Sequence, residues 1–123
     1  MSMMRKDTVV WTEIPVSDME RAKTFYAGLL GAPLVDETGG PNPLAMLPRD
    51  SEDVVAGHLY PGKPAAKGTG PTVHLAVSVP LEEAMTRVRE GGGEVVSETI
   101  TIPAGSFFYA IDTEGNSVGV FKV

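Results

Sequence analysis

The chain has 123 residues, 42% of them apolar, which is the size and composition of a single globular domain with one core. Ten Lys and Arg residues against 16 Asp and Glu residues give a formal net charge of −6, which argues against binding to nucleic acid or anionic membranes. The absence of cysteine excludes disulfides, a thiolate nucleophile and cysteine-ligated metal sites. The apolar run Val9–Trp11 is too short for a signal peptide or membrane span, so we expect a cytoplasmic protein.

The first half of the chain predicts a strand, a helix and three more strands. Thr8–Ile14 is β-branched and aromatic, which is typical of a strand. Ser17 and Glu20 have the spacing of a capping box, and Gly31 is a helix stop, so a helix of about three turns lies between them. Its apolar face is formed by Met19, Ala22, Tyr26, Leu29 and Leu30. The three strands that follow are predicted at Pro33–Glu37, Leu44–Leu47 and Val54–Leu59.

The second half of the chain repeats this order after a linker. Residues 61–71 are rich in Pro, Gly and Lys without a periodic apolar face, as expected of a linker. Thr72–Val79 predicts a strand, and the glycines at 91–93 end a helix whose face is formed by Leu81, Ala84, Met85 and Val88. Three strands follow at Val95–Ile102, Phe107–Ile111 and Ser117–Val123, with a turn at 113–116 before the last.

The two halves align with an offset that drifts from 63 to 61 residues, which indicates two pseudosymmetric modules. We predict one domain over residues 1–123, with module 1 at about 7–60 and module 2 at about 72–123. The fold class is α+β, with two tandem βαβββ modules whose curved mixed sheets form a cleft. Each sheet buries one face under its own helix, and the opposite faces line the cleft.

Alternation along the strands predicts which side chains face the cleft. In the two first strands of the modules these are Trp11 and Glu13, and Thr72 and His74. Phe107 and Tyr109 share a face that we also assign to the cleft. Glu13 is the expected partner of His74, as an acid/base pair. The alternatives are that His74 is structural and that Trp11 only fills the cleft.

The sequence resembles the glyoxalase/bleomycin-resistance/dioxygenase group, the vicinal oxygen chelate superfamily, along essentially its whole length. The resemblance rests on a helix motif and on a turn motif at Asp112, Gly115 and Asn116. The helix motif consists of Asp18, Ala22, Phe25, Tyr26, Leu29, Leu30 and Gly31. Both motifs serve packing and turn geometry. The resemblance implies the glyoxalase/bleomycin resistance/dihydroxybiphenyl dioxygenase fold and a homodimer.

The resemblance also implies four positions for the ligands of a divalent metal. These positions fall here on Trp11, Gly57, His74 and Gly119, of which only His74 can bind a metal. His58 follows Gly57 directly and is expected to point to the other face of its strand. One imidazole is a minority of a normal ligand set, so we predict no cofactor, with a divalent metal as the alternative.

Three functions remain for this chain. The first is a glyoxalase-like protein that binds a small organic molecule between the modules without the usual metal centre. The second is a metal-dependent lyase, isomerase or dioxygenase with atypical ligands, and the third is sequestration of a drug or toxin. The candidate catalytic residues are His74 and Glu13. The candidate ligand-binding residues are Trp11, Gly57, Thr72, Phe107, Tyr109 and Gly119.

Overall fold

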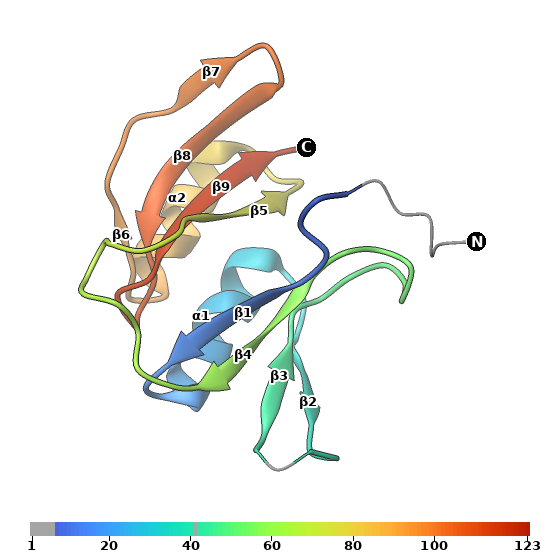
Figure 1. Ribbon diagram of the computed structural model, residues 1–123. Coiled ribbons are helices and arrows are strands. Elements are labelled where there is room, and N and C mark those ends of the chain that lie inside the picture. Colours follow the sequence, from blue (N-terminus) through green and yellow to red (C-terminus); the bar gives the residue numbers. More distant parts are fainter. Residues whose placement is uncertain (1–6, 41) are drawn as a thin grey trace.

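The computed structural model describes residues 7–40 and 42–123 and forms two sheets with one helix each (Figure 1). Residues 1–6 and 41, at the start and in module 1 of the predicted domain, lie outside the described residues. Module 1 contains β1 (Thr12–Val16), α1 (Met19–Leu30), β2 (Val35–Glu37), β3 (Leu44–Met46) and β4 (Gly57–Pro61). Module 2 contains β5 (Val73–Val77), α2 (Leu81–Glu90), β6 (Glu94–Val95), β7 (Ile100–Ile102), β8 (Gly105–Ile111) and β9 (Ser117–Lys122).

The strand orders of the two sheets are equivalent. The first sheet has the order β1-β4-β3-β2, and the second has β5-β9-β8-β6 with β7 also paired to β8. The first and last strands of each module pair in parallel and the other pairs are antiparallel, so both sheets are mixed, as predicted. In Figure 1 both helices lie behind the sheets, which leaves the front faces uncovered by helix. Neither described helix has the length and apolar character needed to cross a bilayer.

Helix α1 ends as predicted, but it begins differently. The N-cap is Asp18, whose Oδ1 accepts a hydrogen bond of 3.1 Å from the Arg21 amide, so the expected capping box of Ser17 and Glu20 is wrong. At the other end Gly31 adopts φ 74°, and its amide donates to the carbonyl of Ala27 at 2.9 Å. The helix buries Ala22, Phe25, Tyr26 and Leu29 in the core.

Helix α2 has a different N-terminus. Pro80 occupies the N-cap position and provides no side-chain cap, whereas two glutamates in the first turn complement the helix dipole. The helix ends at Glu90, directly before the predicted glycine stop, and buries Ala84 and Val88.

Several predicted strands have other bounds in the structure, among them Val54–Leu59, which is observed as β4 at Gly57–Pro61. β1 begins at Thr12 rather than Thr8, because its parallel partner β4 begins at Gly57, which lies opposite Thr12. The single strand predicted at Val95–Ile102 is wrong, since β6 and β7 are separated there. The hydroxyl of Ser97 accepts the amide hydrogen of Tyr109 at 2.8 Å, so a side chain replaces a backbone carbonyl at this point of the ladder.

The expected alternation of faces is confirmed in both first strands. Ile14 and Val16 of β1 and Leu75 and Val77 of β5 are buried in the core. Glu13 and His74, on the opposite faces, are exposed. The core therefore lies between the sheets and the helices, and the other face of each sheet presents polar and aromatic groups.

The two modules contact each other through the turn at residues 112–116 and through α2. The hydroxyl of Tyr26 donates to the buried carboxylate of Asp112 at 2.5 Å, and the side-chain amide of Asn116 donates to the carbonyl of Pro15 at 2.9 Å. Burial, followed by the negative charge of Asp112, raises the pKa of Tyr26 well above its ordinary value. Arg87 of α2 adds a hydrogen bond of 3.1 Å to the carbonyl of Leu29.

Candidate binding cavity between the modules

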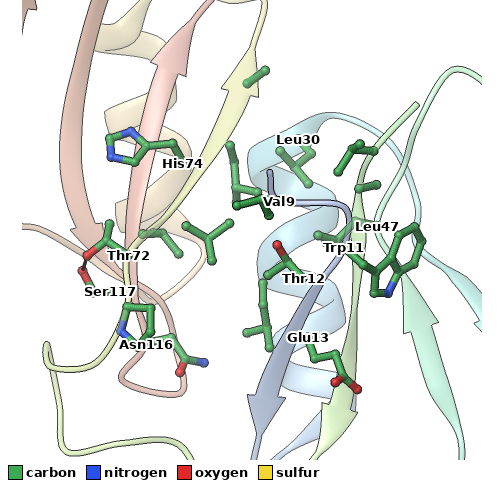
Figure 2. Close-up of a pocket in the computed structure, with 18 of the residues that line it drawn as sticks. Val9, Trp11, Thr12, Glu13, Leu30, Leu47, Thr72, His74, Asn116 and Ser117 are labelled. Atoms are coloured by element: carbon green, nitrogen blue, oxygen red, sulfur yellow. Dashed lines mark hydrogen bonds between the residues drawn. The ribbon is translucent and has the colours of Figure 1, made fainter. Parts of the chain in front are cut away.

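A cavity of about 1190 Å³ lies between the two modules, with β1 on one side and β5 on the other. Four predicted site residues line it: Trp11, Glu13, Thr72 and His74. Figure 2 shows Trp11 and Glu13 on the side of β1, and Thr72 and His74 on the side of β5. The other four predicted residues, Gly57, Phe107, Tyr109 and Gly119, are not among the lining residues. Most of the wall is apolar, and Val9, Leu30, Leu47 and Leu75 contribute to it.

The polar group of module 1 consists of Trp11, His58 and Glu13. The indole Nε1 of Trp11 donates a hydrogen bond of 2.9 Å to Nδ1 of His58. The Nε2 atom of His58 lies 3.2 Å from Oε1 of Glu13. His58 is buried, whereas the Glu13 side chain is 67% exposed. The chain of contacts therefore begins at Trp11 and ends at a carboxylate that faces the cavity.

The position of His58 corrects the sequence-based expectation. His58 was expected on the face opposite to the site, but it lies opposite Glu13 in the parallel register of β1 and β4. Residues opposite each other in register share a face, so His58 belongs with Trp11 and Glu13. The expectation counted faces from Gly57, which the superfamily resemblance had placed with Trp11 among the four metal-ligand positions. In the structure Gly57 lies opposite Thr12, one position further along.

Arg49 was not predicted as a site residue, yet it lies beside Trp11 in the cavity wall. Its guanidinium carbon is 5.1 Å from the centre of the indole ring, within the range of a cation–π contact. Its Nη1 also donates to the carbonyls of Glu52 and Val54, at 3.3 and 3.2 Å. Arg49 thus joins Trp11 to the loop between β3 and β4. The sequence contained no periodic signal for this contact, because the loop has no regular structure.

His74 lies in an aromatic cluster on the face of the second sheet away from the helix. We define this cluster as His74, Phe107, Tyr109 and Phe121. The His74 ring lies 5.2 Å from Phe107 and 5.8 Å from Tyr109, measured between centroids, which confirms that these two residues share its face. Gly119 lies opposite His74 in register, and a side-chain carbon at residue 119 would overlap the His74 ring.

The predicted acid/base pair of His74 and Glu13 is not the arrangement seen. The contact of the Glu13 carboxylate is with His58 of its own sheet, while the His74 ring packs on the second sheet. Thr72, next to His74 on the cavity wall, shares a hydrogen bond of 2.6 Å with Ser117. The cavity wall therefore takes Glu13 from module 1 and His74 from module 2, while the other members of the aromatic cluster lie outside it.

Comparison with known proteins identifies the family. The profile of the Glyoxalase/Bleomycin resistance protein/Dioxygenase superfamily matches residues 8–120. The chain belongs to this superfamily.

Several solved structures share the fold at low sequence identity. A glyoxalase/bleomycin resistance protein from Albidiferax ferrireducens has 21% identity and a TM-score of 0.73, over 95% of this chain and 99% of the other. TnmS3, an antibiotic binding protein from a Streptomyces species, has 23% identity and a TM-score of 0.65, over 97% and 98%. The fosfomycin resistance protein FosX from Mesorhizobium loti has 13% identity and a TM-score of 0.65, over 98% and 94%. No curated protein matches the chain.

The donor set of the cavity does not fit the metal centre that the superfamily resemblance implies. Trp11, Gly57 and Gly119 have no metal-binding side-chain atom. The nitrogens of His58 are both engaged, one by the indole of Trp11 and one by Glu13. Across residues 7–40 and 42–123, no three His, Cys, Asp or Glu side chains gather in a way that could hold a metal ion. His74 would provide only one ligand, which is too few to hold a labile divalent ion.

Proposed function

We propose that this superfamily member binds a small organic molecule in the cavity between its modules, without the metal centre used by its relatives. The observation that carries the proposal is the cavity itself, which is large enough to hold a small organic molecule and is lined by Trp11, Glu13, Thr72 and His74. A largely apolar wall with a few polar groups is the usual form of such a site.

The proposal assigns roles to all the predicted site residues. Trp11 and Thr72 contact the ligand directly, and Phe107 and Tyr109 support it through the aromatic cluster. Gly119 leaves room for the His74 ring above β9, and Gly57 lets β4 lie close to β1 at the edge of the site. Glu13 and His74, which come from different sheets, accept or donate any proton that the ligand exchanges.

Ligand-dependent thermal stability tests the proposal. A metabolite and drug panel should contain compounds that raise Tm by several degrees at saturating concentration, since a ligand at about 100 times its Kd stabilises by about 2.7 kcal/mol. Trp11→Ala should abolish this shift. Val35→Ala, an exposed apolar residue on β2 outside the cavity, is the matched control and should keep it. Unchanged melting across a broad panel would contradict the proposal.

Sequestration of a toxic compound is the second candidate, and the names of two solved structures favour it. TnmS3 is called an antibiotic binding protein and FosX a fosfomycin resistance protein. A sequestering protein returns its ligand chemically unchanged and binds it in a fixed ratio to protein. Mass spectrometry of a ligand recovered after prolonged incubation separates this candidate from an enzyme, which would yield product.

The alternative of a metal-dependent lyase, isomerase or dioxygenase rests on His74 and Glu13 with atypical partners. Metal analysis of protein purified without chelator tests it, because this alternative requires a stoichiometric metal that is lost in His74→Ala. Two further parts of the proposal are a homodimer, by analogy with the superfamily, and a cytoplasmic location, which the absence of cysteine supports. Gel filtration and cell fractionation test these two parts.

A further inference from the structure

The hydrogen bonds of module 1 have a direction that follows from the chemistry of the indole. An indole N–H donates and cannot accept, so Nδ1 of His58 is the acceptor of the 2.9 Å contact and carries no proton. The neutral imidazole then has its hydrogen on Nε2, which lies 3.2 Å from Oε1 of Glu13 and donates to it. The direction is therefore from Trp11 to His58 to Glu13.

Because of this direction, the Glu13 carboxylate at the cavity can only accept hydrogen bonds from a ligand. A carboxylate has no hydrogen to donate and about four lone-pair sites to offer, of which the contact with His58 uses one. Glu13 lines the cavity with a side chain that is 67% exposed. A ligand group that meets this carboxylate must therefore supply the hydrogen, as a hydroxyl or an amine does.

The charges of the cavity wall also disfavour anionic ligands. Its carboxylates are Glu13 and Asp50, and its guanidinium is Arg49. Arg49 contacts the Trp11 ring, and its Nη1 donates to two loop carbonyls, so part of its guanidinium is already engaged within the wall. An anionic ligand would lie beside the negative charge of Glu13, and the repulsion between the two would weaken its binding.

The remaining surfaces of the cavity favour flat rings. Trp11 presents an indole on the side of module 1, and His74 presents an exposed imidazole backed by Phe107 and Tyr109 on the side of module 2. Aromatic side chains bind planar ligands by offset or edge-to-face contact. Figure 2 shows these two residues on opposite sides of the cavity, each with its ring over its own sheet, so a planar ligand that extends over either sheet meets an aromatic side chain.

From these features we infer that the ligand is an uncharged or cationic aromatic molecule whose hydroxyl or amine donates a hydrogen bond to Glu13, the carboxylate that His58 and Trp11 hold in place. This inference rests on the proposed function and names its ligand class. Aromatic carboxylates and phosphates of the same size fall outside that class.

Three probes with one ring system test the inference: 2-naphthol, 2-naphthylmethylamine and 2-naphthoate. Trp11 is the sole tryptophan of the chain, so the single indole N–H signal in a proton–nitrogen correlation spectrum reports both binding and the contact with His58. At pH 7.5 we expect 2-naphthol and 2-naphthylmethylamine to shift this signal. We expect 2-naphthoate to bind about tenfold more weakly or worse, as the loss of a hydrogen bond to a charged group implies.

Two variants that remove the same charge test whether Glu13 causes the preference for 2-naphthol over 2-naphthoate. Glu13→Gln should reduce the ratio of the 2-naphthol and 2-naphthoate affinities to less than about threefold, because the amide can donate to a carboxylate. Glu90→Gln removes the same charge at the exposed end of α2, outside the cavity, and should leave the ratio unchanged.

The outcomes separate the inference from the proposed function. Equal binding of all three probes, or an unchanged ratio in Glu13→Gln, would overturn the inference and leave a small-molecule site in place. No response to any probe at millimolar concentration would also overturn it. The thermal panel would then decide the proposed function independently, because that panel includes compounds without an aromatic donor.

Discussion

Gly57 lies where β1 and β4 run side by side, opposite Thr12. A side-chain carbon at this position would overlap the carbonyl oxygen of Thr12, which belongs to the backbone and cannot move away without separating the strands. The residue therefore has a packing reason to be glycine, separate from any role toward a ligand. Gly119 differs, because the atoms that a side chain would meet there belong to the His74 ring.

We predict that Gly57→Ala lowers the free energy of unfolding by about 1–3 kcal/mol, the usual cost of overpacking a closely packed site. Gly28→Ala is the control: this glycine lies inside α1, and an added carbon there would meet no atom within 4 Å. It should stabilise by up to about 1 kcal/mol through helix propensity. Urea unfolding of both variants measures the difference, and equal effects would contradict our account of Gly57.

The 112–116 turn of module 2 caps a helix of module 1. Glu114 accepts hydrogen bonds from the amides of Ser17 and Asp18 at 3.0 and 2.9 Å and from Nε of Arg21 at 2.8 Å. Its side chain is inaccessible to solvent, although the Arg21 side chain is about half exposed. Ser17, which the sequence suggested as the N-cap, thus binds the other module instead of its own helix.

This environment determines the pKa of Glu114. Burial by itself would raise the pKa, but hydrogen bonds from Arg21, Thr113, Asp18 and Ser17 outweigh it and lower the pKa from 4.5 to about 2. Because the folded-state pKa is depressed, the stabilisation is complete above about pH 4.5. It is lost as the pH falls from there toward 2.

We therefore predict that Glu114→Gln destabilises the protein at pH 7 by about 1–2 kcal/mol, a value reduced for the solvent exposure of Arg21. The difference from wild type should shrink between about pH 4.5 and pH 2. Urea midpoints measured across this window test it, with the exposed Glu90→Gln as the control. A difference that stays constant with pH would show that the charge of Glu114 does not contribute.

At the scale of the whole molecule, the two modules share contacts that neither can form alone. Tyr26 of α1 donates to Asp112 of module 2, and Arg87 of α2 donates to Leu29 of module 1. Both Tyr26 and Asp112 are buried, so separating the modules would expose a hydrogen-bonded pair and part of the core. Such shared burial favours a single cooperative unfolding transition.

A mutation in module 2 should therefore be detected in module 1. Val88→Ala removes buried side-chain volume from α2 and should cost about 2 kcal/mol. Because Trp11 is the sole tryptophan and precedes β1, its fluorescence reports on module 1. We expect its urea midpoint to fall together with the midpoint from far-UV circular dichroism. A fluorescence midpoint that stays at the wild-type value would show that the modules unfold independently.

Much of the fold could be predicted from local patterns. The helix face of α1, the stop at Gly31 and the alternation in β1 and β5 are confirmed, because each depends on residues close together in the chain. The break between β6 and β7 was missed, because it depends on Ser97 meeting Tyr109 of another strand. His58 was misplaced for the same reason, since its face depends on the register of β4 against β1.

The amino-acid sequence alone determined the duplication, the helix faces and the scarcity of metal-binding side chains at the superfamily positions, because composition and periodicity are properties of the chain itself. Only the tertiary structure decided that Glu13 meets His58 rather than His74, that Arg49 covers Trp11 and that Glu114 caps a helix of the other module. The residues in these three contacts are between 38 and 96 positions apart in the sequence. Strand register and module packing bring them together. Periodicity carries no information on either.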